Sequence, residues 1–136
     1  MAYTKTEWVN DSVPAINATN LNKIEQGIYE IDSRTEESSW NDIELANNWQ
    51  TYTTDWQKAQ YKKVGNKVVL RGLITNGTQN SAFTTLPVGY RPPLAIYVVC
   101  ADDSGATNIR INPNGTCIIY SYQNWVSLSG IEFYIN

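Results

Sequence analysis

Apolar residues recur at heptad spacing in one stretch near the N-terminus. The four positions, separated by three, four and three residues, are Leu21, Ile24, Ile28 and Ile31. A stripe this narrow, with polar residues between, predicts an amphipathic helix from Ala18 to about Ser38 whose seam pairs with other helices in a coiled coil. Isoleucine at the d positions favours three or four strands over two. A helix docked against its own domain is the alternative.

The expected helix has a defined start. Asn17 is a good N-cap, because its side chain can accept a hydrogen bond from a free amide of the first turn. Ile16 and Leu21 occupy the two positions of a hydrophobic staple. Gly27 inside the helix costs roughly 1 kcal/mol relative to alanine. So short a helix is marginal alone and needs a second trimerising element beside it.

After Trp49 the pattern changes to short apolar runs bounded by Gly, Pro and Asn. Such runs predict antiparallel strands, over residues 57–64, 67–75, 82–86, 94–101, 109–111, 116–122 and 131–135. Strands at this spacing favour an antiparallel β-sandwich that is jelly-roll-like. The run from Leu94 to Ala101 is almost continuously apolar, so we expect it to be buried on both faces.

The first two of these runs predict a hairpin around a turn at residues 65–66. In its second strand, alternation places Leu70 and Gly72 on one face. Alternation places Arg71 and Leu73 on the other face. We therefore expect one continuous strand over residues 67–75.

These patterns divide the chain into the four segments of an α+β fold. Residues 1–16 form an extended N-terminal arm, which is irregular because Pro14 disfavours helix at the residue before it. The next two segments are a coiled-coil stalk helix over residues 17–38 and a linker over residues 39–48. Residues 49–136 form the β-sandwich head.

Charge and hydropathy exclude several classes of partner. The formal net charge is −3 and the pI is about 4.8, and no cluster of Lys and Arg stands out. Without a basic surface, neither nucleic acid nor an anionic membrane is an expected partner. No apolar stretch approaches the ~20 residues of a membrane helix. The first ten residues lack the pattern of a secretory signal, so export would need another route, such as lysis.

Residues suited to catalysis are few. The chain has no histidine, which removes the commonest general base and the commonest zinc ligand. The acidic residues of the β region are Asp55, Asp102, Asp103 and Glu132. Asp102 and Asp103 are adjacent in an expected turn, so they are poorly placed to flank a glycosidic bond. A calcium site that adds Asn108 is less favoured than a solvated turn, and we expect no catalytic residue, no metal and no cofactor.

Aromatic residues are abundant and mostly carry a polar group, with 5 Trp and 9 Tyr against 2 Phe. A saccharide site needs an aromatic platform flanked by hydrogen-bonding groups. The stretch that best supplies both contains Tyr120, Tyr122, Gln123, Asn124 and Trp125. Alternation places Tyr120 and Tyr122 on one face, and Asp102 and Asp103 can reach the same end of the sandwich. The alternative is that these aromatic residues belong to the core or to a trimer interface.

A second aromatic cluster and one arginine have structural interpretations. Trp49, Tyr52 and Trp56 stand where the stalk meets the head, so packing at that junction is the favoured role. Residues 89–93 form a rigid segment, because glycine permits a positive φ and the prolines fix the chain after it. Arg91 within it could pair with an anionic polymer, but a tie to a neighbouring group in a structural turn is favoured.

The two cysteines, Cys100 and Cys117, lie in apolar β-like runs without metal-binding spacing. Synthesis without a signal implies a reducing compartment. Buried reduced thiols are therefore favoured, and a disulfide between neighbouring strands is the alternative.

Two parts of the sequence resemble proteins of phage tails. The segment from Trp8 to Ile28, WVNDSVPAINATNLNKIEQGI, closely resembles a segment of tail and baseplate fibre proteins of phages that infect Gram-positive bacteria. The segment from Thr85 to Pro92, TLPVGYRP, resembles the C-terminal head domain of phage tail fibres. The same likeness covers Tyr61, Val64-Gly65, Val68 to Leu70, Gly72, Trp125, Leu128, Gly130-Ile131 and Phe133.

The resemblance implies a parallel homotrimer in which a short helical stalk holds three β-sandwich heads. It implies that the N-terminal arm attaches to other tail or baseplate proteins and that the heads bind cell-wall or surface saccharide of the host. The expected function is host recognition by a tail fibre or tip protein of the virion, without catalysis. A structural or adaptor subunit of the baseplate without receptor contact, and a small surface-polymer hydrolase, remain as alternatives.

Overall fold

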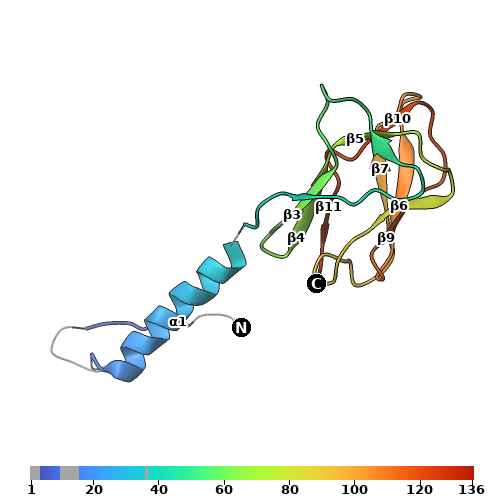
Figure 1. Ribbon diagram of the computed structural model, residues 1–136. Helices are drawn as coiled ribbons and strands as arrows, with labels where there is room; N and C mark the ends of the chain where they lie inside the picture. The colour runs from blue at the N-terminus through green and yellow to red at the C-terminus, as the bar shows by residue number, and fades with distance from the viewer. Residues whose placement is uncertain (1–3, 10–15, 36) are drawn as a thin grey trace. The chain divides into compact units, whose positions relative to one another are not determined.

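The computed structural model describes residues 4–9, 16–35 and 37–136 (Figure 1). The chain divides into two compact units, Met1–Glu36 and Glu37–Asn136. The first contains one helix, and the second contains all the described strands. Part of the expected arm, residues 1–3 and 10–15, lies outside the described residues.

The helix of the first unit, α1, spans Ala18–Thr35. Asn17 caps it as expected, since its side-chain oxygen accepts a hydrogen bond from the Asn20 amide at 2.9 Å. The expected staple is not formed, because the Ile16 side chain is 79% exposed.

The seam of α1 is largely open to solvent in the single chain. Leu21, Ile28 and Ile31 are 49%, 58% and 53% exposed, whereas Ile24 is partly buried. A coiled coil would cover such a stripe, and it stays a prediction.

The helix ends three residues before its expected end. Glu37 forms an antiparallel bridge with Val64. The Ser38 amide donates to the Lys63 carbonyl oxygen at 2.8 Å, and the Lys63 amide donates to the Ser38 hydroxyl at 2.7 Å. Because these backbone groups pair with a strand, the chain is extended here rather than helical.

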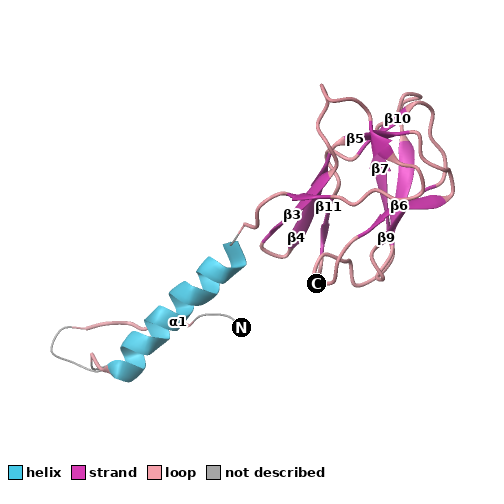
Figure 2. Cartoon of the chain, in the orientation of Figure 1, coloured by secondary structure: helices cyan, strands magenta, loops and turns pink. Residues whose placement is uncertain are grey.

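The second unit contains three antiparallel sheets among the described residues (Figure 2). Sheet A has the order β1 (Asn41–Asp42), β3 (Gln60–Val64), β4 (Lys67–Arg71), β11 (Glu132–Tyr134). Sheet B has the order β10 (Trp125–Ser127), β5 (Leu73–Thr75), β2 (Gln50–Thr51). Sheet C has the order β6 (Ser81–Thr85), β9 (Thr116–Ile119), β8 (Thr107–Ile111), β7 (Ile96–Cys100).

One hydrophobic core joins the three sheets. Its fully buried side chains come from every sheet and include Val68, Ile74, Phe83, Ile109 and Val126. Burial of apolar area on this scale is the main stabilising term of a small β domain. The expected antiparallel β-rich fold with one short helix is confirmed, and a jelly-roll sandwich stays a prediction.

The strand expected over residues 67–75 is two strands in different sheets. Gly72 separates β4 from β5 with a φ of +123°, and a Cβ added there would lie 2.5 Å from the Ala59 Cα. Only glycine accommodates both the conformation and this approach. Leu73 therefore does not share a face with Arg71 as alternation predicted, and it is largely buried.

The prediction that residues 94–101 are buried on both faces is wrong. β7 is the last strand in the order of sheet C, so it has a hydrogen-bonded neighbour on one side only. Tyr97 and Val99 are 65% and 74% exposed on its outer face, and Leu94 before it is 75% exposed. A continuous apolar run here marks an exposed apolar face, defined by Leu94, Tyr97 and Val99.

Candidate functional site

An aromatic cleft lies on the outer side of sheet B. It has a volume of about 290 Å³ and is lined by Tyr52, Trp56, Leu73, Ala101, Trp125 and Ser127. Pairing of Trp125 with Thr75 and of Ser127 with Leu73 places these side chains on one face of adjacent strands. The alternate residues, Ile74 and Val126, are fully buried in the core. The floor of the cleft is therefore fixed by the strand register.

The loop that forms one wall of the cleft, residues 52–57, is held by Leu73 at both ends. The Tyr52 amide donates to the Leu73 carbonyl oxygen at 2.9 Å, and the Leu73 amide donates to the Gln57 carbonyl oxygen at 2.9 Å. Within the loop, the Trp56 amide donates to the Thr53 carbonyl oxygen at 3.2 Å. These bonds position the wall without any help from a ligand.

The rings of the wall meet edge to face. The Tyr52 and Trp56 centroids lie 6.4 Å apart at an interplanar angle of 76°, which is a favourable aromatic geometry. Trp56 is nevertheless 57% exposed. No charged residue is among the six that line the cleft. The cleft therefore offers mainly aromatic and aliphatic surface, with hydroxyl groups on Tyr52 and Ser127.

A second depression is also lined by Trp56. It has a volume of about 370 Å³ and is lined by Thr51, Thr53, Thr54, Trp56 and Lys58. Three threonine hydroxyls give this threonine depression more hydroxyl groups than the aromatic cleft, which has those of Tyr52 and Ser127. Trp56 lines both hollows, so the two adjoin at its ring.

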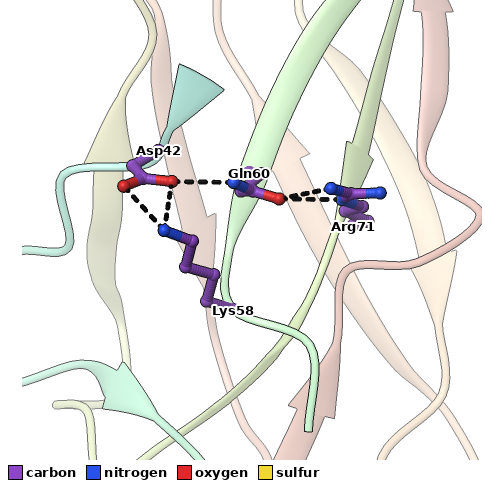
Figure 3. A network of polar contacts seen from close by, with 4 residues as sticks. All are labelled: Asp42, Lys58, Gln60 and Arg71. Carbon is purple, nitrogen blue, oxygen red and sulfur yellow. Dashed lines mark hydrogen bonds and ion pairs between the residues drawn. The ribbon is translucent and has the colours of Figure 1, made fainter. Parts of the chain in front are cut away.

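The charge of Lys58 is compensated by a polar ladder on the outer face of sheet A, shown in Figure 3. The ladder consists of Asp42, Lys58, Gln60 and Arg71. The Lys58 ammonium lies 3.0 Å from the Asp42 carboxylate. Gln60 donates to Asp42 at 2.8 Å and accepts from the Arg71 guanidinium at 2.9 and 2.6 Å.

The ladder lowers the pKa of one carboxyl group and contacts one tryptophan ring. The hydrogen bond from Gln60, followed by that from Lys58, lowers the pKa of Asp42 below its ordinary value. The Arg71 guanidinium also lies 3.8 Å from the centre of the Trp40 ring, in a cation–π contact. Side chains on this face satisfy one another, which suits a structural role.

The two tyrosines expected to share a face do not lie together. The Tyr122 ring packs 4.7 Å from buried Trp49, and its hydroxyl donates to the Gly77 carbonyl oxygen at 2.9 Å. The Tyr120 ring lies 6.4 Å from the exposed ring of Tyr97. Alternation fails because β9 ends at Ile119, so the chain after it is no longer pleated. Tyr122 therefore has a packing role against the core, away from Tyr120.

The expected acidic turn is not solvated at its first residue. Asp102 is 5% exposed, and its carboxylate accepts hydrogen bonds from the Ser104 amide at 2.9 Å and the Ser104 hydroxyl at 2.7 Å. Asp102 also bridges to Val126 of β10. It therefore orders its own turn, whereas Asp103 is exposed. Among the described residues, no group of acidic or cysteine side chains is arranged to hold a metal ion.

Trp125 alone of the predicted saccharide residues lines the aromatic cleft. Gln123 and Asn124 are exposed beside it, with the Asn124 carbonyl oxygen accepting from the Thr75 hydroxyl at 2.6 Å. Tyr52 and Trp56, which were assigned to packing, form the opposite wall. The signal in the sequence for this wall is the run of threonines, Thr51, Thr53 and Thr54, that surrounds Tyr52 and precedes Trp56.

Two further predictions concern Arg91 and the cysteines. Arg91 is tied to a neighbour as favoured, since its Nε donates to the Leu86 carbonyl oxygen at 2.8 Å. Cys100 and Cys117 are buried and unpaired, and burial raises the pKa of each thiol to about 12.

No described helix has the length and apolar character needed to traverse a membrane.

Comparison with solved structures identifies a similar fold. The crystal structure of the receptor-binding protein gp15 of Listeria phage PSA matches with a TM-score of 0.62 and 18% sequence identity. The match covers 93% of this chain and 92% of that chain. The sequence matches no protein-family model, and the search of curated proteins found no match. At this identity the likeness shows the fold.

Proposed function

We propose that this chain is a phage tail protein that recognises the host surface and binds saccharide there as a homotrimer. The observation that carries the proposal is the aromatic cleft, a preformed ligand-sized hollow in a fold similar to that of a phage receptor-binding protein. In this account the protein is part of the virion tail or baseplate. Its N-terminal arm attaches to other tail proteins.

Exposed apolar stripes support assembly into a trimer. The α1 seam leaves Leu21 and Ile28 about half exposed, and pairing of three helices would cover such a stripe. The exposed apolar face of sheet C, with Tyr97 and Val99, adds surface for contact between neighbouring heads. Contact there would supply the second trimerising element that so short a helix needs.

Saccharide binding follows from what the cleft can do chemically. The rings of Tyr52, Trp56 and Trp125 can stack on the apolar face of a sugar, and neighbouring threonines can pair with its hydroxyls. Binding by one shallow cleft is weak, and three heads on each of many copies multiply it. The chain acts as a binder rather than an enzyme in this account.

Adsorption to host cells tests the proposal. Fluorescently labelled full-length protein is incubated with a panel of Gram-positive strains, and its mass is measured by light scattering. We expect binding to some strains and a mass three times the 15.4 kDa of the chain.

Three outcomes would contradict parts of the proposal. A measured mass equal to that of one chain would contradict the proposed homotrimer. Absence of binding to every strain would favour an adaptor subunit of the baseplate, and release of reducing ends from wall polymer would favour a hydrolase.

A further inference from the structure

We propose that the aromatic cleft and the threonine depression, both lined by Trp56, are adjoining subsites for consecutive units of an uncharged oligosaccharide. The unit in the aromatic cleft carries a methyl group, as an acetamido sugar or a deoxy sugar does. This inference rests on the proposed saccharide-binding function and names the ligand class of that site.

The lining of the aromatic cleft requires a ligand with apolar surface. Five of its six residues present aromatic or aliphatic surface, while Tyr52 and Ser127 each add a hydroxyl group. A plain hexose placed there would bury more hydroxyls than these few polar groups can pair with, which is costly. A methyl group between Leu73 and Ala101 would bury apolar surface instead, while the sugar ring stacks on an aromatic wall.

The threonine depression differs from the aromatic cleft in its larger number of hydroxyl groups. Thr51, Thr53 and Thr54 can each donate and accept a hydrogen bond, so hydroxyls of a second sugar unit find partners there. Lys58 does not turn this into an anion site, because its ammonium is already paired with Asp42 at 3.0 Å. The charge of the two hollows therefore fits a neutral glycan better than a polyanion.

Trp56 is shared by both hollows, which links the two subsites. Its loop is held by backbone hydrogen bonds to Leu73 at both ends, so the ring does not need to be ordered by the ligand. A preformed wall lowers the entropic cost of binding. Two adjoining units should therefore bind more tightly than one.

Calorimetric titration of the full chain with matched sugars tests the inference. Chitobiose and cellobiose differ by the acetamido groups, and L-fucose and L-galactose differ by the deoxy position. N-acetylglucosamine measures what one unit contributes. We expect chitobiose to bind at least tenfold more tightly than cellobiose or N-acetylglucosamine, or L-fucose to exceed L-galactose by a similar factor if the methyl group is that of a deoxy sugar.

Three variants locate the site. Trp56→Ala is expected to lower affinity for the preferred ligand at least tenfold. Thr53→Val is expected to reduce the gain of chitobiose over N-acetylglucosamine while leaving the affinity for the single unit unchanged. Tyr134→Ala serves as a matched control, because that ring is also exposed, at 66%, but lines neither hollow.

The outcomes separate the inference from the proposed function. Equal binding of matched sugars with and without the methyl group, or of one and two units, would overturn the inference and leave saccharide binding standing. Tighter binding of anionic than of neutral sugars would do the same. Absence of binding to every sugar would overturn the inference, and it would overturn the proposed function as well if labelled protein also failed to adsorb to cells.

Discussion

The outer faces of sheets A and B belong to the same β domain, but the side chains of sheet A contact one another whereas those of sheet B are partly open to solvent. On sheet A every charged group of the polar ladder is paired with another side chain (Figure 3). The Arg71 guanidinium also covers the Trp40 ring at 3.8 Å. On sheet B the aromatic cleft leaves Trp56 57% exposed. Two tryptophans on one small domain are thus in opposite situations.

Whether the side chains of a face are already paired with one another distinguishes a structural surface from a surface that can bind a ligand. Groups that satisfy one another stabilise the fold and have little to offer a ligand. Exposed rings on a wall fixed by backbone hydrogen bonds contribute little to stability, because burial is what stabilises. They are available to a partner, which supports the proposal that sheet B binds the ligand while sheet A stabilises the fold.

The residue at the junction of the two faces gives the largest expected effect. Gly72→Ala would place a Cβ 2.5 Å from the Ala59 Cα, at a φ of +123°. We expect the free energy of unfolding to fall by more than about 3 kcal/mol, because both backbone strain and a steric clash must be relieved. Urea denaturation measures it.

Gly130→Ala is the control for backbone strain alone. Its φ is +94°, but an added Cβ would meet nothing within 4 Å. A loss of about 1 kcal/mol is expected there. Equal losses of stability for the two variants would mean that the close approach of Gly72 to Ala59 does not add to the effect of backbone strain.

Removing the stacked guanidinium tests the structural face. Arg71→Ala loses two hydrogen bonds to Gln60 and the contact with Trp40, so we expect about 2 kcal/mol lower stability. Arg71→Met keeps the apolar stem and should recover part of the loss. Glycan affinity should be unchanged in both; a fall in affinity without loss of stability would place binding on sheet A.

The exposed ring tests the opposite face. Trp56→Ala should lower the free energy of unfolding by only about 1 kcal/mol, because Trp56 is 57% exposed and loses one aromatic contact. The tenfold loss of affinity expected for the same variant corresponds to about 1.4 kcal/mol. Thermal denaturation and calorimetry on one sample give both numbers, and a large destabilisation would show that Trp56 is a packing residue after all.

The smallest expected effect is a pH dependence of the ladder. The pKa of Asp42 is lowered below its ordinary value of 3.8, so its carboxylate stabilises the folded state above that pH and loses the effect as pH falls through the folded pKa. Wild type should melt slightly above Asp42→Asn at neutral pH, and the gap should close in strong acid or high salt. A gap that widens in acid would reverse the sign and rule out the ladder as its cause.

Local patterns predicted much of this structure. The Asn17 cap, the α1 stripe and the hairpin of β3 and β4 follow from short-range rules on capping, heptads and turns. These rules did not predict the end of the strand at Gly72. The alternating pattern continues past this residue, and the close approach of Gly72 to Ala59, which lies far away in the sequence, leaves no local signal. The sequence shows that a glycine can adopt unusual backbone conformations, but it does not show which residues pack against that glycine.

The cleft was harder to predict because its walls come from distant segments. Tyr52 and Trp56 are brought to Trp125 by β5, a strand of three residues that pairs with both β2 and β10. Such short strands carry too little periodicity to recognise. Trp125 was predicted as a site residue from its polar neighbours, and it lines the cleft. Tyr122 was placed on the wrong face, because alternation does not show that β9 ends at Ile119.

The most direct test of the account is heteronuclear NMR of the indole N–H signals during titration with chitobiose, with L-fucose in parallel. The five tryptophans, assigned by single Trp→Phe variants, report on different surfaces. The account predicts that the signals of Trp56 and Trp125 shift with the preferred ligand while that of Trp40, under Arg71 on sheet A, stays in place. Shifts confined to Trp40, or no shift of Trp56 and Trp125 with a sugar that binds, would contradict it.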